Sequence, residues 1–274
     1  MEETINMDQA LGAIISKIDL RDYKAKSTVP KDRIPTEYRL PIVRIKNQGN
    51  VGSCVAHALS SVIEYYNYTQ HGINNEMSVS YIYGNRETSS HKGKGMIMRD
   101  ALAAVCKYGD VEKNDFPGNV EVPTAIDFFE KKKESLHDKA YPNRISGYYK
   151  LTTEADIKAA LLAKNPVIFA MYWDKGNTIG LDNVINVKSV DKSNGGHCMI
   201  IYGWNEKGWR IQNSWGVGWG MGGTAILPYD VKIREAWAIT DNITDNLQIK
   251  KPFSSNYGEI IAKILNVILN YFVV

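Results

Sequence analysis

The sequence predicts an α+β fold, in which a mainly helical first half is followed by a strand-rich second half. In the first half, apolar side chains recur every three or four residues, as they do from Val55 to Tyr66. In the second half, short apolar runs alternate with turns that contain glycine and asparagine, which is the pattern of strands and hairpins. We therefore expect two subdomains with a ligand-binding cleft between them.

The composition is typical of a globular protein and argues against several classes of partner. The chain has 274 residues, of which 44% are hydrophobic and 23% are charged. Its net charge of +3 is small and not concentrated, so we expect no nucleic-acid partner. The cysteines at 54, 106 and 198 lack the spacing of a zinc site, and we predict neither a metal nor a cofactor. The acidic N-terminus does not resemble a signal peptide, and the odd number of cysteines favours an intracellular, reducing compartment.

The first 30 residues are expected to form an N-terminal arm, residues 1–30. They join a short apolar patch, Ala10–Ile18, to a charged run, Asp19–Lys24. This mixture fits a short helix or an extended segment outside the main core. Three prolines between residues 30 and 41 then predict an irregular start to a main domain that spans residues 31–240.

Periodicity and turn residues place the elements of the main domain. We expect a mainly helical half at 31–120 and a mainly strand half at 121–240. Predicted helices lie at 55–68, 98–108 and 154–163, with a short helix or turn at 78–83. Predicted strands lie at 167–172, 197–204, 209–213, 224–227 and 236–240.

The tail, residues 241–274, carries a separate signal. From Glu259 to Val274 the polar residues fall in one narrow stripe, and nearly every other side chain is apolar. The pattern predicts an amphipathic helix of about 16 residues, which is short for a membrane span. Packing on the domain or on a partner chain is the favoured hypothesis, and a peripheral membrane contact is the alternative.

The stretch Gln48-Gly-Asn-Val-Gly-Ser-Cys54 places a cysteine at the start of the first predicted helix. Glycines interrupt regular structure before it, and Ser53 is expected to cap the helix. In the first turn of a helix, unpaired N–H groups and a partial positive charge favour a thiolate. Cys54 is therefore a candidate nucleophile, provided that the chain also supplies a base and an oxyanion donor.

Of the five histidines, His197 is the candidate base. It begins a predicted buried strand, and Asn213 follows beyond a hairpin turn, where its amide oxygen can reach the imidazole. His57 is expected on the polar side of the first helix, pointing away from Cys54. Gln48 is the candidate oxyanion donor, because a tight glycine loop can bring its amide beside the Cys54 N–H. Taken alone, His197 would more often be a core histidine and Gln48 a solvent-facing side chain.

Three segments together resemble the papain (cathepsin-like) cysteine peptidase family: Gln48-Gly-x-x-Gly-Ser-Cys54, Gly196-His197 and Gln212-Asn-Ser-Trp-Gly-Val-Gly-Trp-Gly220. The resemblance covers roughly residues 31–240. It implies a papain-like fold, with a helical left subdomain, a β-barrel-like right subdomain and the active-site cleft between them. It also implies that Cys54 and His197 rest as a thiolate–imidazolium pair. In this arrangement Asn213 orients the imidazole, Trp215 shields the His197–Asn213 pair from water, and Gln48 completes the oxyanion hole.

The departures from the family pattern are also informative. Secreted members usually have a cysteine at the position of Val51 and a tryptophan at the position of Val55. The usual disulfide therefore cannot form, and the chain resembles the disulfide-poor branch seen in bacteria, protists and large DNA viruses. A viral member would also be expected in the virion. Residues 1–30 are too few for a full inhibitory propeptide, but they can supply a short one that crosses the cleft.

By the same similarity, Gly95 is expected to bind the backbone of an extended substrate. Four apolar residues are expected to line the main specificity pocket: Ile97, Met98, Ala170 and Cys198. This set implies a preference for an apolar residue next but one before the scissile bond.

Three functions fit the sequence. The first is a cysteine endopeptidase that cuts peptide or protein substrates through a thioester on Cys54. The second is a catalytically silent papain-fold binding protein, against which the complete set of four candidate residues argues. The third is an exopeptidase or a self-inhibited enzyme, in which residues 1–30 or 241–274 occupy part of the cleft.

Overall fold

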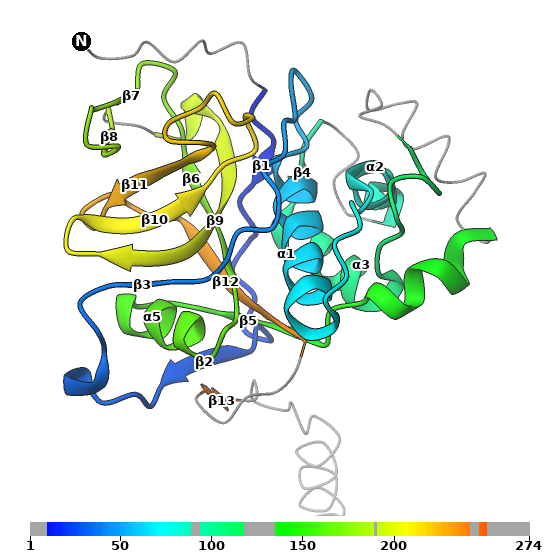
Figure 1. The fold of residues 1–274 in the computed structure, drawn as a ribbon, viewed down its shortest axis with the longest axis horizontal. Helices are drawn as coiled ribbons and strands as arrows, with labels where there is room; N and C mark the ends of the chain where they lie inside the picture. Colours follow the sequence, from blue (N-terminus) through cyan, green and yellow to red (C-terminus); the bar gives the residue numbers. More distant parts are fainter. Residues whose placement is uncertain (1–9, 89–93, 118–134, 189–190, 242–246, 251–274) are drawn as a thin grey trace, which may run out of the picture.

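The computed structural model describes residues 10–88, 94–117, 135–188, 191–241 and 247–250. The helices α1 (Cys54–His71), α2 (Val79–Gly84) and α3 (Met98–Tyr108) lie on one side of the molecule, and the main sheet lies on the other (Figure 1). The predicted mixture of a helical part and a strand-rich part is confirmed.

The helix α1 connects the two parts. It contacts β9 (Gly196–Asn205) of the main sheet, and Leu59 of α1 lies in the same buried core as Ile201 of β9. Gly72 ends α1 in the left-handed conformation, with φ of 69°, and its N–H bonds to carbonyls of the last turn. Glycine adopts this conformation without the steric cost that a Cβ would add.

The other helices follow the sequence closely. The helix α3 has the predicted bounds and ends at Gly109, whose φ is 76°. The predicted helix at 154–163 is α5 (Glu154–Leu162), and a capping box between Thr153 and Asp156 fixes its start. Short 3₁₀ turns lie at Lys31–Arg33, Asn85–Thr88, Tyr141–Asn143 and Lys192–Asn194.

Among the described residues the main sheet has nine strands, eight of them in the order β11-β10-β9-β6-β12-β5-β2-β13, with β3 beside β9. The predicted strands are β6 (Val167–Tyr172), β9, β10 (Gly208–Gln212), β11 (Thr224–Pro228) and β12 (Glu235–Thr240). The remaining members are β2 (Lys24–Ser27), β3 (Tyr38–Arg39), β5 (Gly147–Lys150) and β13 (Leu247–Lys250). Five of the six residues of β6 are buried, as its continuous apolar run predicts.

Two small two-stranded sheets complete the described fold. One pairs β7 (Thr178–Ile179) with β8 (Ile185–Asn186). The other pairs β1 (Ala13–Ile14) in parallel with β4 (Met96–Ile97), which directly precedes α3. The strand β1 belongs to the N-terminal arm, so the arm is tied to the helical part.

The expected position of the arm outside the core is wrong. Its described part is extended, Ala13 is 4% exposed and Ser16 is 8% exposed. The reason is that the arm finds hydrogen-bonding partners in strands that lie far away in the sequence. Such partners are invisible to local periodicity.

The predicted helix at 259–274, and with it any membrane contact, lies outside the described residues. Within the described ranges, no helix has the length and hydropathy needed to cross a membrane. The proposed boundaries at residues 30, 120 and 240 stay predictions.

Candidate active site

Cys54 is the first residue of α1 and is fully buried. The loop before it turns tightly, because the Val51 N–H donates to the Gln48 carbonyl (3.2 Å) and the Ser53 N–H donates to the Val51 carbonyl (2.7 Å). Ser53 occupies the predicted N-cap position of α1, but its side chain makes no cap bond. Its Oγ lies instead 3.1 Å from Nδ1 of His57.

His57 does not lie on a polar face. It is 2% exposed, and its Nδ1 bonds to the carbonyl and hydroxyl oxygens of Ser53. Burial lowers the pKa of His57 to about 4. The prediction that His57 does not serve Cys54 agrees with this bonding, which engages the ring with the start of its own helix.

His197 and Asn213 meet where β9 begins and where the chain leaves β10. Their contact joins Nε2 of His197 to Oδ1 of Asn213 at 2.8 Å. The same Oδ1 accepts the Ser214 N–H at 2.8 Å, which identifies this atom as the oxygen of the amide. The proton of a neutral His197 therefore sits on Nε2. Its buried Nδ1 has no hydrogen-bond partner among the described residues, so it is available as a base.

Aromatic rings surround this imidazole. Trp215 stacks on His197 with ring centroids 4.5 Å apart and an interplanar angle of 20°, and Trp173 meets the ring edge-on at 5.7 Å. Both tryptophans are buried. This enclosure lowers the pKa of His197 to about 4, because a charged imidazolium loses the solvation of water.

The thiol of Cys54 is enclosed as well. Burial raises its pKa to about 11, and the N–H groups of Cys198, Gly12 and Val55 oppose that rise. These N–H groups place the start of β9 and the N-terminal arm beside the sulfur. The neutral thiol and neutral imidazole are thus favoured while the arm is in place. The thiolate–imidazolium pair stays a prediction for a state in which the site is open to water.

Gln48 is held between the cysteine loop and the Asn213 loop. It is 1% exposed, its Oε1 accepts the hydroxyl of Ser214 (2.6 Å), and its N–H donates to the Ser214 carbonyl (2.8 Å). Its Nε2 donates to the carbonyls of Ala10 (2.6 Å) and Val51 (2.9 Å). A carbonyl of the arm therefore occupies the donor that was predicted to bind an oxyanion.

The arm runs directly over the site. The Gly12 N–H donates to the carbonyl of Gly196 (3.1 Å), and the Met96 N–H donates to the carbonyl of Gly12 (2.8 Å). A Cβ on Gly12 would lie 1.9 Å from the carbonyl oxygen of Gly52, in the loop before Cys54. Only a glycine can pass this close to the cysteine loop.

Charged groups hold the next part of the arm. The Ser16 N–H donates to Oε2 of Glu235 at 2.8 Å. Asp22 makes two hydrogen bonds to Arg99, of 2.6 and 2.7 Å, and a third of 3.3 Å to Lys150. Asp22 is 8% exposed, so these ion pairs are shielded from solvent and hold the arm to both parts of the fold.

Comparison with known proteins agrees with this geometry. A sequence model of the family described as papain family cysteine protease matches residues 32–242, which is most of the chain. The chain belongs to the papain family of cysteine proteases.

Individual relatives of this papain-family chain are distant. A peptidase C1-like protein, L477, of Acanthamoeba polyphaga mimivirus is 28% identical over 220 residues, which cover 73% of this chain and 70% of the relative. A cysteine protease of Blomia tropicalis is 27% identical over 196 residues, covering 66% of this chain and 56% of the relative.

A solved structure supports the papain-like fold. The crystal structure of xylellain, a cysteine protease from Xylella fastidiosa, matches with a TM-score of 0.72 and 22% identity, covering 86% of this chain and 97% of xylellain. At this identity the similarity shows the fold alone. Proteins of a large DNA virus and of a bacterium are thus among those similar to this chain, and its place in a disulfide-poor branch stays a prediction.

The residues predicted to bind substrate fall into two groups in this papain-family chain. Gly95 and Ile97 meet the arm: a Cβ on Gly95 would lie 2.5 Å from the Gly12 carbonyl oxygen, and Ile97 pairs with Ile14. Met98, Ala170 and Cys198 are buried, and the last two are direct partners across β6 and β9. The roles of these residues in substrate binding stay predictions.

Two residues near the site were missed. Glu235 faces Ala170 in the pairing of β12 with β6, is 4% exposed, and accepts both the Ser16 N–H and Trp237 Nε1–H. Trp173 encloses the imidazole together with Trp215. A charged residue directly before the predicted strand at 236–240 was the available signal for Glu235, but only the register of the sheet places it beside Ala170.

Proposed function

We propose that the chain is a cysteine endopeptidase that its own N-terminal arm holds inactive in the described state. The observation that carries the proposal is the 2.8 Å bond between Nε2 of His197 and Oδ1 of Asn213. This bond leaves Nδ1 of His197 free to accept a proton, in a strand whose start lies beside the sulfur of Cys54.

The reaction follows from these positions. Cys54 gives its proton to Nδ1 of His197, and its sulfur attacks the carbonyl carbon of a peptide bond. The oxyanion that forms is stabilised by Nε2–H of Gln48 and the backbone N–H of Cys54. The C–N bond then breaks, and His197 returns the proton to the leaving amine. In the second half, His197 takes a proton from water and the resulting hydroxide attacks the thioester carbonyl carbon. The C–S bond then breaks, the acid is released, and His197 returns its proton to the sulfur of Cys54.

The arm supports a self-inhibited resting state. Its Ala10 carbonyl accepts a hydrogen bond from Nε2 of Gln48, so a substrate oxyanion cannot use the same donor while the arm is bound. Two structures with a similar fold are of proteases that retain their pro segment. Procathepsin L 3 of Tenebrio molitor has a TM-score of 0.63, 19% identity and coverage of 81% of this chain and 76% of its own. The proform of the ragweed allergen Amb a 11 has a TM-score of 0.61, 23% identity and coverage of 79% and 69%.

Two parts of the proposal concern substrate and setting. The preference for an apolar residue next but one before the scissile bond remains part of the proposal. The nucleophile is a free thiol, as are Cys106 and Cys198. Activity should therefore require reducing conditions, which an intracellular compartment supplies.

Labelling of the full chain with an epoxide inhibitor of the papain class tests the proposal. Mass spectrometry should find one label per chain, attached to Cys54, and none in Cys54→Ala. Opening the arm by substitution at Gly12 should speed this labelling. If neither the full chain nor the opened variant is labelled, the chain is a silent papain-fold binding protein.

A second measurement separates an endopeptidase from an exopeptidase. Fluorogenic peptides blocked at both ends should be cut by the opened variant as fast as peptides with free ends. Cleavage restricted to free-ended peptides would instead identify an exopeptidase.

A further inference from the structure

Two adjoining loops expose large apolar side chains, and we call this group the apolar patch: Leu181, Val217 and Met221. Their exposed fractions are 89%, 70% and 68%. Leu181 lies in the turn between β7 and β8, which Figure 1 shows on the sheet side of the molecule, beside β11. Val217 and Met221 lie in the loop between β10 and β11. Exposed apolar groups on adjoining loops are typical of a binding surface.

The two loops are held together by the side chain of Asn183. Its Oδ1 accepts the Met221 N–H at 3.0 Å. A Cβ on Gly220 would lie 3.2 Å from the same Oδ1 and 3.3 Å from Cδ1 of Ile179 in β7. Leu181 is two residues before Asn183, so Leu181 and Met221 belong to one surface.

The arm marks the path of an extended chain through the cleft. Its strand β1 pairs with β4, Gly12 lies against the loop before Cys54, and the Ala10 carbonyl accepts Nε2 of Gln48 at 2.6 Å. The strand β4 ends at Ile97, which is predicted to bind the part of a substrate that precedes the scissile bond. The opposite end of the path, at Ala10, is therefore the end that would hold residues after the scissile bond.

The apolar patch continues this path beyond the end at Ala10. Asn47, which precedes the glutamine that holds Ala10, forms a bridge with Trp215. A Cβ on Gly216 would lie 3.2 Å from Nδ2 of Asn47. Val217 is the next residue of the chain and the first of the patch. A polypeptide that replaces the arm and runs on past Ala10 therefore meets Val217 first and the rest of the patch after it.

We propose that the apolar patch binds apolar side chains of the substrate, from about the third residue after the scissile bond onward. The two residues from Gly12 to Ala10 span about 7 Å of extended chain, so a substrate needs at least one further residue to reach Val217. Burial of apolar surface on both partners supplies the attraction. The inference rests on the proposed peptidase activity and names the substrate segment that this site would select.

Two donor–quencher peptides test this selection in the Gly12→Ala protein, whose arm is expected to be open. The peptides are identical up to the second residue after the scissile bond, and the next three residues are leucines in one peptide and serines in the other. Mass spectrometry confirms that both are cut at the same bond. We expect kcat/KM of the leucine peptide to be higher on the order of tenfold, because its side chains bury apolar surface against the patch.

Charge substitutions in the patch separate this selection from a general effect of hydrophobic peptides. Leu181→Asp and Met221→Asp are made separately in the Gly12→Ala protein. Each should lower the ratio of the two kcat/KM values to less than about threefold, because an apolar side chain would then have to bind beside a carboxylate and remove its water.

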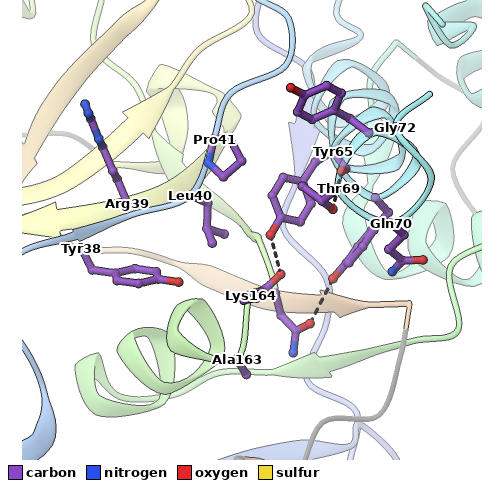
Figure 2. A pocket seen from close by; sticks show the side chains of 13 residues that line it. Tyr38, Arg39, Leu40, Pro41, Tyr65, Thr69, Gln70, Gly72, Ala163 and Lys164 are labelled. Atoms are coloured by element: carbon purple, nitrogen blue, oxygen red, sulfur yellow. Dashed lines mark hydrogen bonds between the residues drawn. The ribbon is translucent and has the colours of Figure 1, made fainter. Parts of the chain in front are cut away.

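Ile73→Asp is the matched control, because Ile73 is an apolar residue that is 44% exposed and lies outside the cleft. It follows Gly72, and the 18 residues of α1 rise about 1.5 Å each, which puts this end of the helix about 25 Å from Cys54. Gly72 also lines a separate hollow of about 720 Å³, whose exposed side chains include Gln70 and Lys164 (Figure 2). Ile73→Asp should keep the full preference for the leucine peptide.

Three results would overturn the inference. Equal cleavage of the two peptides would remove the patch from the substrate path and leave the proposed function intact, whereas failure to cut either peptide would refute the proposed function and the inference with it. A preference that Ile73→Asp lowers as much as Met221→Asp would show that the patch is not the cause. Self-association of the Cys54→Ala protein that Met221→Asp abolishes, measured by sedimentation, would make the occupant a second copy. If Gly12→Ala does not fold, Asp22→Asn supplies the opened arm for the same comparison.

Discussion

Replacement of Gly12 by alanine should open the active site. A Cβ at this position would lie 1.9 Å from the carbonyl oxygen of Gly52, 2.3 Å from its carbonyl carbon and 2.7 Å from its Cα. All three atoms belong to the backbone of the loop that carries Cys54, so no side-chain rotation relieves the clash. The arm must therefore move away from Gly52.

The size of the effect follows from the cost of overpacking. Forcing one extra carbon into a well-packed site costs about 1–3 kcal/mol. Because about 1.4 kcal/mol corresponds to a tenfold change in an equilibrium constant, the ratio of open to closed arm should rise roughly 5- to 150-fold. Moving Gly12 also weakens its two backbone bonds, to Gly196 and Met96, which act in the same direction.

The assay is the second-order rate constant for labelling of Cys54 by an epoxide inhibitor, followed by mass spectrometry. If the closed arm limits access, the rate constant of Gly12→Ala should rise by the same factor as the open fraction. Leu20→Ala is a matched control on the same arm, because Leu20 is 84% exposed and should leave the rate unchanged.

One result would refute the reasoning. If Gly12→Ala keeps the circular dichroism and melting temperature of the parent protein and is labelled at the same rate, the close fit of Gly12 does not keep the site shut.

Three further predictions test the groups around the site. Gln48→Ala should lower kcat/KM on the order of 10²- to 10³-fold, because it removes a donor to the oxyanion. The measurement uses the Gly12→Ala background, since Gln48→Ala also releases the Ala10 carbonyl of the arm and that effect does not matter once the arm is open. An unchanged kcat/KM would show that Gln48 is not part of the oxyanion hole. Burial lowers the pKa of His57 and His197 from 6.5 to about 4. Between these values the unfolded chain binds more protons than the folded one, so the free energy of unfolding should decrease as the pH is lowered, by up to ~3 kcal/mol per histidine. Urea unfolding at pH 7 and pH 5 measures this fall, which should be smaller in His57→Gln; an equal fall would contradict the assignment. Asp22→Asn should weaken the bonds to Arg99 and Lys150 and speed amide exchange at residues 12–16 about tenfold or more, whereas unchanged exchange would show that Asp22 does not hold the arm.

Local sequence signals predicted the helices and strands that depend on their own residues. The apolar spacing between Met98 and Tyr108, with Gly109 after it, is sufficient to define α3. The continuous apolar run at 167–172 likewise defines β6. Ser53 shows the limit of such signals, because its hydroxyl bonds to the buried His57 and makes no bond to the helix N-terminus.

Positions that depend on distant partners were not predictable in this way. The strand β1 forms because Ala13 and Ile14 pair with Met96 and Ile97, more than 80 residues away. Glu235 is charged and buried, and only the pairing of β12 with β6 places it beside Ala170 and the arm. Neither contact leaves a periodic pattern in the sequence.

The sequence by itself determined the family and the four residues that carry the proposed chemistry, because three separated motifs agree in order and spacing. Tertiary structure decided the state of those residues. It placed the arm beside the loop of Gln48 and Cys54 through hydrogen bonds of the arm's own backbone, which any sequence can form and which therefore leave no signature. It also enclosed the thiol and the imidazole, and the loss of water favours their neutral forms until the arm is displaced.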